Sequence, residues 1–155
     1  MDKVKGTIIA VISALMSWLG ILAVPVLILV ICNVTDYITG LFAARYREET
    51  ITSYKGIRGI IKKICMWLLI GIGAMMDILI NYAIETAGIG FSFPFVVATI
   101  VVVWLVVNEI ISILENMIDI GVDIPPFLMP IVKYIKKKAE ETAQIIDEEE
   151  SEDEV

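Results

Sequence analysis

Very long apolar segments limit the folds that are open to this chain. Between Gly6 and Ala44 the only charged residue is Asp36. One unbroken helix over that stretch would be about 58 Å long at ~1.5 Å per residue, nearly twice the thickness of the hydrocarbon core of a membrane. With 58% apolar and only 20% charged residues in the whole chain, lipid fits it better than water as a solvent. The sequence therefore predicts an all-α integral membrane protein.

The first apolar stretch must contain a break. The segment from Gly20 to Pro25 supplies it, since glycine weakens a helix and proline removes a backbone donor. Residues 1–20 form an amphipathic helix with a stripe of small residues. With about 14 residues before the break, this helix is short for a span, which favours a position at the membrane interface. Insertion as a fourth membrane helix stays open.

Three segments are long enough to cross the membrane as helices. Gly71, Gly73 and Ala74 give the second one a small-residue surface for close helix packing. Pro94 stands in the first turn of the third, where proline costs little. The three helices form a transmembrane domain over residues 21–116, with spans at about residues 21–44, 64–84 and 93–115.

The distribution of basic residues predicts the orientation. The connection over residues 45–63 holds six of the twelve bases against two acids, so the positive-inside rule places it in the cytoplasm. The connection over residues 85–90 has one acid and no base and belongs outside. Three spans then put the N-terminus outside, whereas Lys3 and Lys5 favour the inside, as a fourth span would allow.

The C-terminal part of the chain is charged and follows the last span. Residues 117–146 form a cytoplasmic region with a short basic helix, whose lysines can meet anionic lipid headgroups. Residues 147–155 hold seven of the nineteen acids and little apolar surface, so we expect a disordered acidic tail. This tail is either a solvated end or a repulsive, regulatory segment. The basic helix runs from Phe127 to about Ala143 and carries Lys133, Lys136, Lys137 and Lys138.

The composition argues against catalysis, metal binding and nucleic-acid binding. Histidine, the commonest general base and metal ligand, is absent from the sequence. Cys32 and Cys65 stand in apolar runs, where a thiol packs as a small hydrophobe. The net charge of -7 comes from the acidic tail, because the rest of the chain carries twelve acids and twelve bases. We therefore expect a non-enzymatic protein without a cofactor or a metal ion.

Three acidic residues inside the apolar spans need an explanation, because a charge at membrane depth costs a few kcal/mol. Asp36 and Glu109 come at similar depth in the cytoplasmic half, about 13 Å and about 15 Å from the ends of their segments, and Asp77 lies nearer the outer side. Polar residues recur at helical spacing around Glu109. The candidates for oligomer contacts or pore lining are Asp36, Thr39, Gly40, Asp77, Asn108, Glu109, Ser112, Glu115 and Asn116.

Two interpretations of this polar stripe stay open. It packs against Asp36 and Thr39 of the first span through hydrogen bonds, or it lines a pore or an oligomer interface. Three or four thin helices cannot enclose a wide channel, so a pore would require many copies of the chain.

Three motifs follow one another along the chain: DYITGL at residues 36–41, SYKGIRGIIKK at residues 53–63 and NEIISILEN at residues 108–116. In this order they resemble the bacteriophage holins of the toxin-secretion and phage-lysis type. A Pro125–Pro126 turn into a basic helix follows the third motif, and the resemblance covers about residues 25–138. It implies a protein of the bacterial cytoplasmic membrane that assembles with itself into lesions and so releases an endolysin or a large toxin.

The resemblance also gives the second motif a role as a basic cytoplasmic loop. Gly56 and Gly59 would shape it, while Arg58, Lys62 and Lys63 would anchor it at the lipid surface after Ser53. Gly40 and Ala44 would let a neighbouring helix approach closely. The alternative to a holin is a small accessory or structural subunit of a membrane transporter complex, in which the polar stripes are partner contacts.

Overall fold

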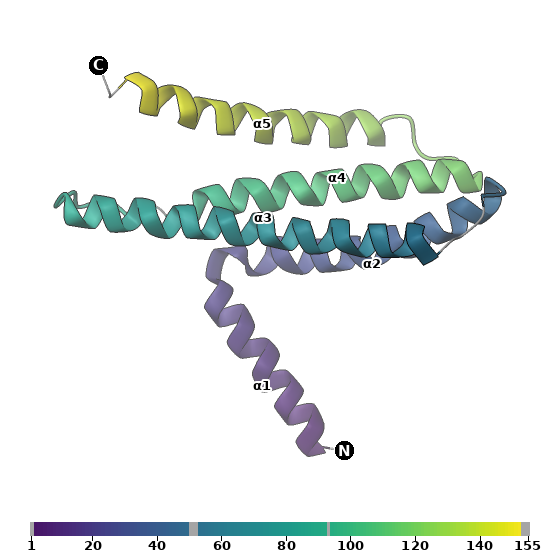
Figure 1. Ribbon diagram of the computed structural model, residues 1–155, viewed down its shortest axis with the longest axis horizontal. Coiled ribbons are helices and arrows are strands. Elements are labelled where there is room, and N and C mark those ends of the chain that lie inside the picture. Colours follow the sequence, from purple (N-terminus) through teal and green to yellow (C-terminus); the bar gives the residue numbers. More distant parts are fainter. Residues whose placement is uncertain (1, 50–52, 93, 153–155) are drawn as a thin grey trace.

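Five α-helices make up the chain in the computed structural model, which describes residues 2–49, 53–92 and 94–152 (Figure 1). Helices α2 to α5 run side by side along the long axis, whereas α1 projects away from them. The described residues contain no strand, so the predicted all-α fold is confirmed. The elements are α1 Asp2–Leu19, the short 3-10 helix η1 Gly20–Leu22, α2 Ala23–Tyr46, α3 Ser53–Thr86, α4 Val96–Ile120 and α5 Leu128–Glu152.

Three helices of the described residues are long and apolar enough to cross a membrane, as the apolar segments predict. The predicted start of the third span, residue 93, lies outside the described residues. Phe95 adopts a left-handed backbone conformation with φ of 46°, so α4 begins only after it and Pro94 precedes the helix instead of standing in its first turn. The three candidate spans are Gly20–Tyr46, Gly56–Thr86 and Val96–Ile120.

Helix α4 lies at the centre, because α2, α3 and α5 each pack against it. Gly73 permits the closest approach, since a Cβ atom at this position would lie 3.0 Å from the Cα atom of Ala98. Gly73 therefore makes the predicted small-residue contact, whereas Gly71 faces open space. The core between the three spans consists of Leu29 from α2, Met66 and Ile70 from α3, and Val102 and Leu105 from α4.

The predicted break near Gly20 is present. Gly20 has a positive φ of 52°, and η1 redirects the chain so that α1 leaves the other helices at a steep angle (Figure 1). Among the described residues, α1 is not one of the candidate spans. Its exposed apolar residues include Ile8 and Ile9, and a position at the membrane interface stays a prediction.

The predicted basic cytoplasmic loop is wrong where the structure describes it. Residues from Ser53 onward already belong to α3, so the predicted loop residues form its first turns. The reason is that isoleucines continue the helical period of the span into this segment, and lysine and arginine are good helix formers that offset the glycines. The affected residues are Ser53, Gly56, Arg58, Gly59, Lys62 and Lys63.

The predicted disorder of the acidic tail is also wrong for residues 147–152, which continue α5 as helix to Glu152. Glutamate has high helix propensity, and the amphipathic turns that precede the tail supply the helical nucleus that isolated acidic residues lack. The basic helix is therefore longer than the predicted short one. Residues 153–155 lie outside the described part of the chain.

Candidate functional site

A partly buried lysine connects the three spans. The Nζ atom of Lys63 on α3 donates to Oδ2 of Asp36 on α2 at 2.9 Å and to Oε2 of Glu109 on α4 at 2.5 Å. It also donates to Oδ1 of Asn33 on α2 at 3.2 Å. These four residues form what we call the charged cluster. Glu109 is only 3% exposed, and the side chains of Lys63 and Asp36 are 19% and 18% exposed.

The charged cluster lies at membrane depth. Asp36 is about 15 Å along α2 from Tyr46, and Glu109 is about 17 Å along α4 from Ile120, at ~1.5 Å per residue. Both ends belong to the cytoplasmic side in the orientation predicted from the basic residues. In that orientation the three ionisable groups would meet in the cytoplasmic half of the bilayer, where an unpaired charge is costly.

Two carboxylates share one ammonium in this cluster, so with every group ionised it carries one net negative charge. Desolvation offsets much of the attraction in a buried ion pair, but removal of one partner costs about 3–5 kcal/mol. The cluster thus fixes how α2, α3 and α4 sit against each other more than it stabilises them. Asn33 keeps an unused donor, because its buried Nδ2 atom has no acceptor among the described residues.

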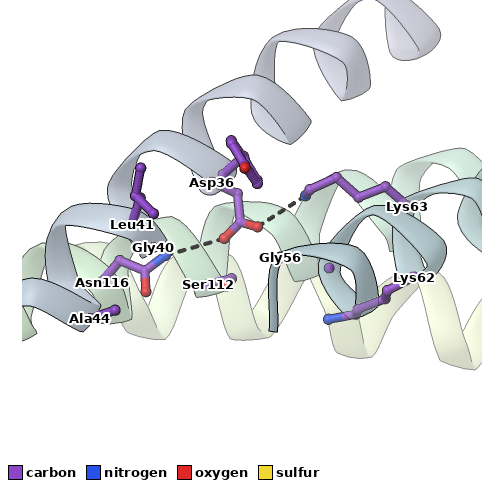
Figure 2. A pocket seen from close by; sticks show the side chains of 11 residues that line it. Asp36, Gly40, Leu41, Ala44, Gly56, Lys62, Lys63, Ser112 and Asn116 are labelled. Carbon is purple, nitrogen blue, oxygen red and sulfur yellow. Dashed lines mark hydrogen bonds and ion pairs between the residues drawn. The ribbon is translucent and has the colours of Figure 1, made fainter. Parts of the chain in front are cut away.

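The polar stripe of α4 extends the cluster toward the cytoplasm. Asn116 Nδ2 donates to Asp36 Oδ1 and to Thr39 Oγ1, both at 3.2 Å. Gly40 faces the same amide, since a Cβ atom there would lie 3.5 Å from Asn116 Nδ2. Figure 2 shows Asp36 between Asn116 on one side and Lys63 on the other. Of the stripe, Asn116 therefore makes the predicted hydrogen bonds to Asp36 and Thr39 within one copy of the chain.

A groove of about 290 Å³ opens beside the cluster, between α2 and α3 with α4 beneath (Figure 2). Asp36, Lys63 and Asn116 make its floor polar. A Cβ atom on Gly56 or Gly59 would meet nothing within 4 Å, so these glycines face open space instead of a neighbouring helix. The groove is thus an unfilled surface with a charged floor. Its other lining residues are Tyr37, Gly40, Leu41, Ala44, Lys62 and Ser112.

The remaining stripe residues line a second groove, of about 460 Å³, between α3 and α4. Asn108 and Glu115 take part there, together with Lys62 and Ser112, which border both grooves. Glu109 also borders the second groove. Polar groups therefore run from one groove to the other across the cytoplasmic half of α4.

Asp77 does not join this cluster. It is fully buried at the other end of α4, where its two carboxylate oxygens accept the backbone N–H groups of Val97 at 2.9 Å and Ala98 at 2.8 Å. The first N–H groups of a helix lack partners within it and carry partial positive charge, so they can hold a carboxylate without a basic side chain. Asp77 thus caps α4 from the neighbouring helix, in place of Phe95, which makes no side-chain cap.

A further tie joins the C-terminal ends of α2 and α4. Arg47, just beyond α2, donates to Asp119 near the end of α4 and to Glu49 at 3.1 Å. The hydrogen bond to Asp119 is the main cause that raises the pKa of the Arg47 guanidinium. Arg47 and Lys63 were both predicted to lie in an aqueous connection, so the contact of Arg47 with Asp119 and the inward position of Lys63 were not expected. The helical spacing of Gly56, Gly59 and Lys63 was the signal that α3 begins earlier.

Comparison with known proteins agrees with the geometry. The profile of the bacteriophage holin family matches residues 13–137 of this 155-residue chain. The chain belongs to the bacteriophage holin family. The matched region includes the charged cluster, both grooves and the Asp77 cap, and it ends within α5 before the acidic residues. It begins earlier than the three motifs suggest and takes in the second part of α1.

Bacterial relatives of this holin-family protein extend over most of its length. It is 34% identical over 129 residues to an uncharacterized protein of Halalkalibacterium halodurans, covering 82% of this chain and 90% of the relative. It is 32% identical over 114 residues to an uncharacterized protein of Listeria monocytogenes, covering 74% and 73%. It is 28% identical over 128 residues to the uncharacterized 14.9 kDa protein in nagH 3'region of Clostridium perfringens, covering 82% and 89%.

No solved structure matches the chain. Holin-family proteins are typically non-enzymatic membrane proteins, and three candidate spans make this one a multi-pass member.

Proposed function

We propose that this protein is a holin of the bacterial cytoplasmic membrane, which assembles with itself into lesions that release an endolysin or a large toxin. Family membership supports the class of function. The observation that carries the proposal is the charged cluster at membrane depth beside an open groove with a polar floor. Such a surface is tolerated in one copy and becomes useful only in an assembly.

A single copy can stay in the bilayer without harm because its ionisable groups are matched internally. Lys63 pairs with both carboxylates, and Asn116 holds the free oxygen of Asp36. Charged groups that are paired inside a helical bundle avoid the cost of facing lipid. The protein can therefore accumulate as a folded, inserted protomer.

The groove over Asp36 is the surface on which copies of the chain assemble. Acyl chains fill a groove with a charged floor poorly, whereas a polar helix face of a second copy, or water, satisfies it. The small residues Gly56 and Gly59 let a helix backbone approach closely. The excess carboxylate of the cluster then lies at a contact between copies or at a wet wall. Three spans enclose no wide channel, so many copies form each lesion.

The test replaces Glu109 by leucine and by glutamine. Glu109→Leu leaves Lys63 paired with Asp36 and removes the excess charge, so the protomer should insert at normal levels. With the excess carboxylate of the cluster lost, it should release little of a cytoplasmic reporter protein and give fewer high-order crosslinked species. Glu109→Gln keeps hydrogen bonding and should fall between leucine and the native chain. Asp123→Asn, at an exposed position in the link after α4 and outside both grooves, is the matched control.

Induced expression in a bacterium, with membrane potential, viability and reporter release followed over time, gives the readout. The native chain should show a delay and then an abrupt collapse. Normal lysis timing in Glu109→Leu would contradict the role of the cluster. A gradual decline of the native culture without reporter release would contradict the holin itself and would favour a small accessory subunit of a transporter complex.

A further inference from the structure

Helix α5 folds back along the central span. The link after α4 turns the chain, and α5 then runs beside α4 for most of its length (Figure 1). Val132 is buried against α4 in a cluster with Val107 and Leu114. Leu128 and Met129 add to this contact. An amphipathic, charged helix therefore covers one apolar face of a helix that is apolar enough to span the membrane.

The contact between α5 and α4 places charged residues of α5 at the depth of the membrane span. Trp104 Nε1 donates to Glu140 Oε1 at 2.9 Å, and Lys136 Nζ lies 5.5 Å from the centre of the same indole. Trp104 is about 24 Å along α4 from Ile120, at ~1.5 Å per residue. Glu140 and Lys136 thus lie well beyond the midpoint of the span, and the acidic residues that follow lie farther along α5.

The opposite face of α5 also carries charged side chains at the depth of the span. The side chains of Lys137 and Lys138 are 73% and 56% exposed, and they would face acyl chains if α5 stayed on α4 in a bilayer. Charged side chains at that depth are strongly disfavoured. The apolar contact between α4 and α5 does not offset this cost. Lipid tails can cover the apolar face of α4 just as α5 does, so the contact gains no free energy in a bilayer. The docked position of α5 is therefore favoured in water and disfavoured in lipid.

The link allows α5 to move as a unit. The N–H groups of Gly121 and Val122 bond back to Ile118 and Met117 at 2.9 Å, so α4 ends in a complete cap of its own. Gly121 has a φ of 92°, and a pair of prolines precedes α5. A rotation in this link leaves both helices intact.

Helix α5 also keeps apolar surface that α4 does not cover. Phe127, Ile131 and Ile135 are 65%, 49% and 43% exposed on successive turns. At ~100° per residue, Lys138 lies within this stripe, and Lys133 and Lys137 lie to one side of it. An apolar stripe bordered by lysines suits a helix that lies in the headgroup region of an anionic membrane surface.

We propose that α5 is a hinged arm, which leaves α4 in the bilayer and binds the anionic lipid surface of the cytoplasmic leaflet. The apolar stripe enters the interface, and the lysines contact the headgroup phosphates. The movement exposes Trp104 and the apolar face of α4 to the membrane interior. This arrangement rests on the three spans and does not require lesion formation.

The departure of α5 is tested with the full-length protein in vesicles that contain brominated phosphatidylcholine, a quencher of tryptophan in the membrane interior. One variant keeps Trp104 as its only tryptophan, and a matched variant keeps only Trp67, which is 37% exposed on α3. With the arm away, quenching of Trp104 should come within about twofold of that of Trp67. Several-fold weaker quenching of Trp104 would show α5 still docked and would overturn the proposal.

The lipid partner is tested with a polarity-sensitive fluorophore at Ile135→Cys, after replacement of Cys32 and Cys65 by alanine. Vesicles of phosphatidylcholine with phosphatidylglycerol should shift its emission to shorter wavelengths, and phosphatidylcholine alone should give a several-fold smaller shift. Glutamine at positions 133, 137 and 138 should abolish the difference, whereas arginine at the same positions should keep it. Equal shifts in both lipids, or no effect of the glutamine substitutions, would contradict the binding of α5 to an anionic lipid surface.

Both measurements are made without lysis. A protein that binds lipid through α5 but never releases a reporter would contradict the proposed holin function alone. A protein that lyses cells with α5 still docked on α4 would contradict the hinged arm alone.

Discussion

Replacement of Lys63 by methionine isolates the contribution of the charged cluster. The variant keeps the length of the side chain and leaves Asp36 and Glu109 without their shared cation. Loss of one partner from a buried ion pair costs about 3–5 kcal/mol, and a charge at the centre of a membrane helix costs about 2.5–3.5 kcal/mol. Because Asp36 is 18% exposed and keeps its bond to Asn116, we expect the lower part of this range, about 3 kcal/mol. That is on the order of 100-fold in the unfolding equilibrium.

The assay is reversible unfolding in mixed micelles, with increasing sodium dodecyl sulfate and tryptophan fluorescence as the signal. Lys62→Met removes the same charge one residue away and leaves both ion pairs in place, so it should change the free energy of unfolding by less than about 0.5 kcal/mol. The double variant Lys63→Met/Glu109→Gln should recover about 2 kcal/mol, since neutralising one carboxylate relieves the unpaired charge. Equal, small effects of the Lys63 and Lys62 variants would refute the idea that the cluster fixes the three spans.

Three further outcomes follow from the helix contacts. Gly73→Ala should destabilise the protein by about 1–3 kcal/mol in the same unfolding assay, because its Cβ atom would lie 3.0 Å from the α4 backbone, whereas Gly71→Ala should be neutral or stabilising, since a Cβ atom there meets nothing within 4 Å. Asp77→Asn should cost about 1.5–3 kcal/mol, because an amide cannot accept both N–H groups at the start of α4; an unchanged melting profile would contradict the cap. In intact cells, a cysteine at Ser53 should be shielded from an impermeant thiol reagent and one at Gly88 should react; the opposite pattern would reverse the orientation.

The spans were predictable from the sequence because hydropathy over about 20 residues depends only on composition and length. The break at Gly20 was predictable for a related reason, since glycine and proline act locally. The start of α3 was not predictable in this way. Its first turns are polar enough to suggest a loop, and only packing against the other spans decides that Lys63 turns inward. The helical conformation at the acidic end of α5 was not predicted either, because charge density alone does not decide between coil and helix.

The isolated acids at membrane depth were visible in the sequence, but their partners were not. Each acid finds a different kind of partner: Glu109 has a lysine from a neighbouring helix, Asp36 shares that lysine and an amide, and Asp77 holds a helix N-terminus. Which partner is used depends on how each helix is rotated about its axis, and the hydrophobic pattern determines that rotation only coarsely in lipid.

These polar contacts have a shared consequence for α4. Asp77 holds its N-terminal end, Lys63 its C-terminal half, and Arg47 its C-terminal end. Lipid gives helices no hydrophobic reason to associate, so polar ties and close packing must hold α4 in register with its neighbours. With three ties along one helix, sliding or rotation of α4 breaks more than one of them at once. The protomer is therefore held in one arrangement, and the proposed self-assembly must use the surfaces that these ties leave unused, namely the groove over Asp36 and the face of α4 beneath α5.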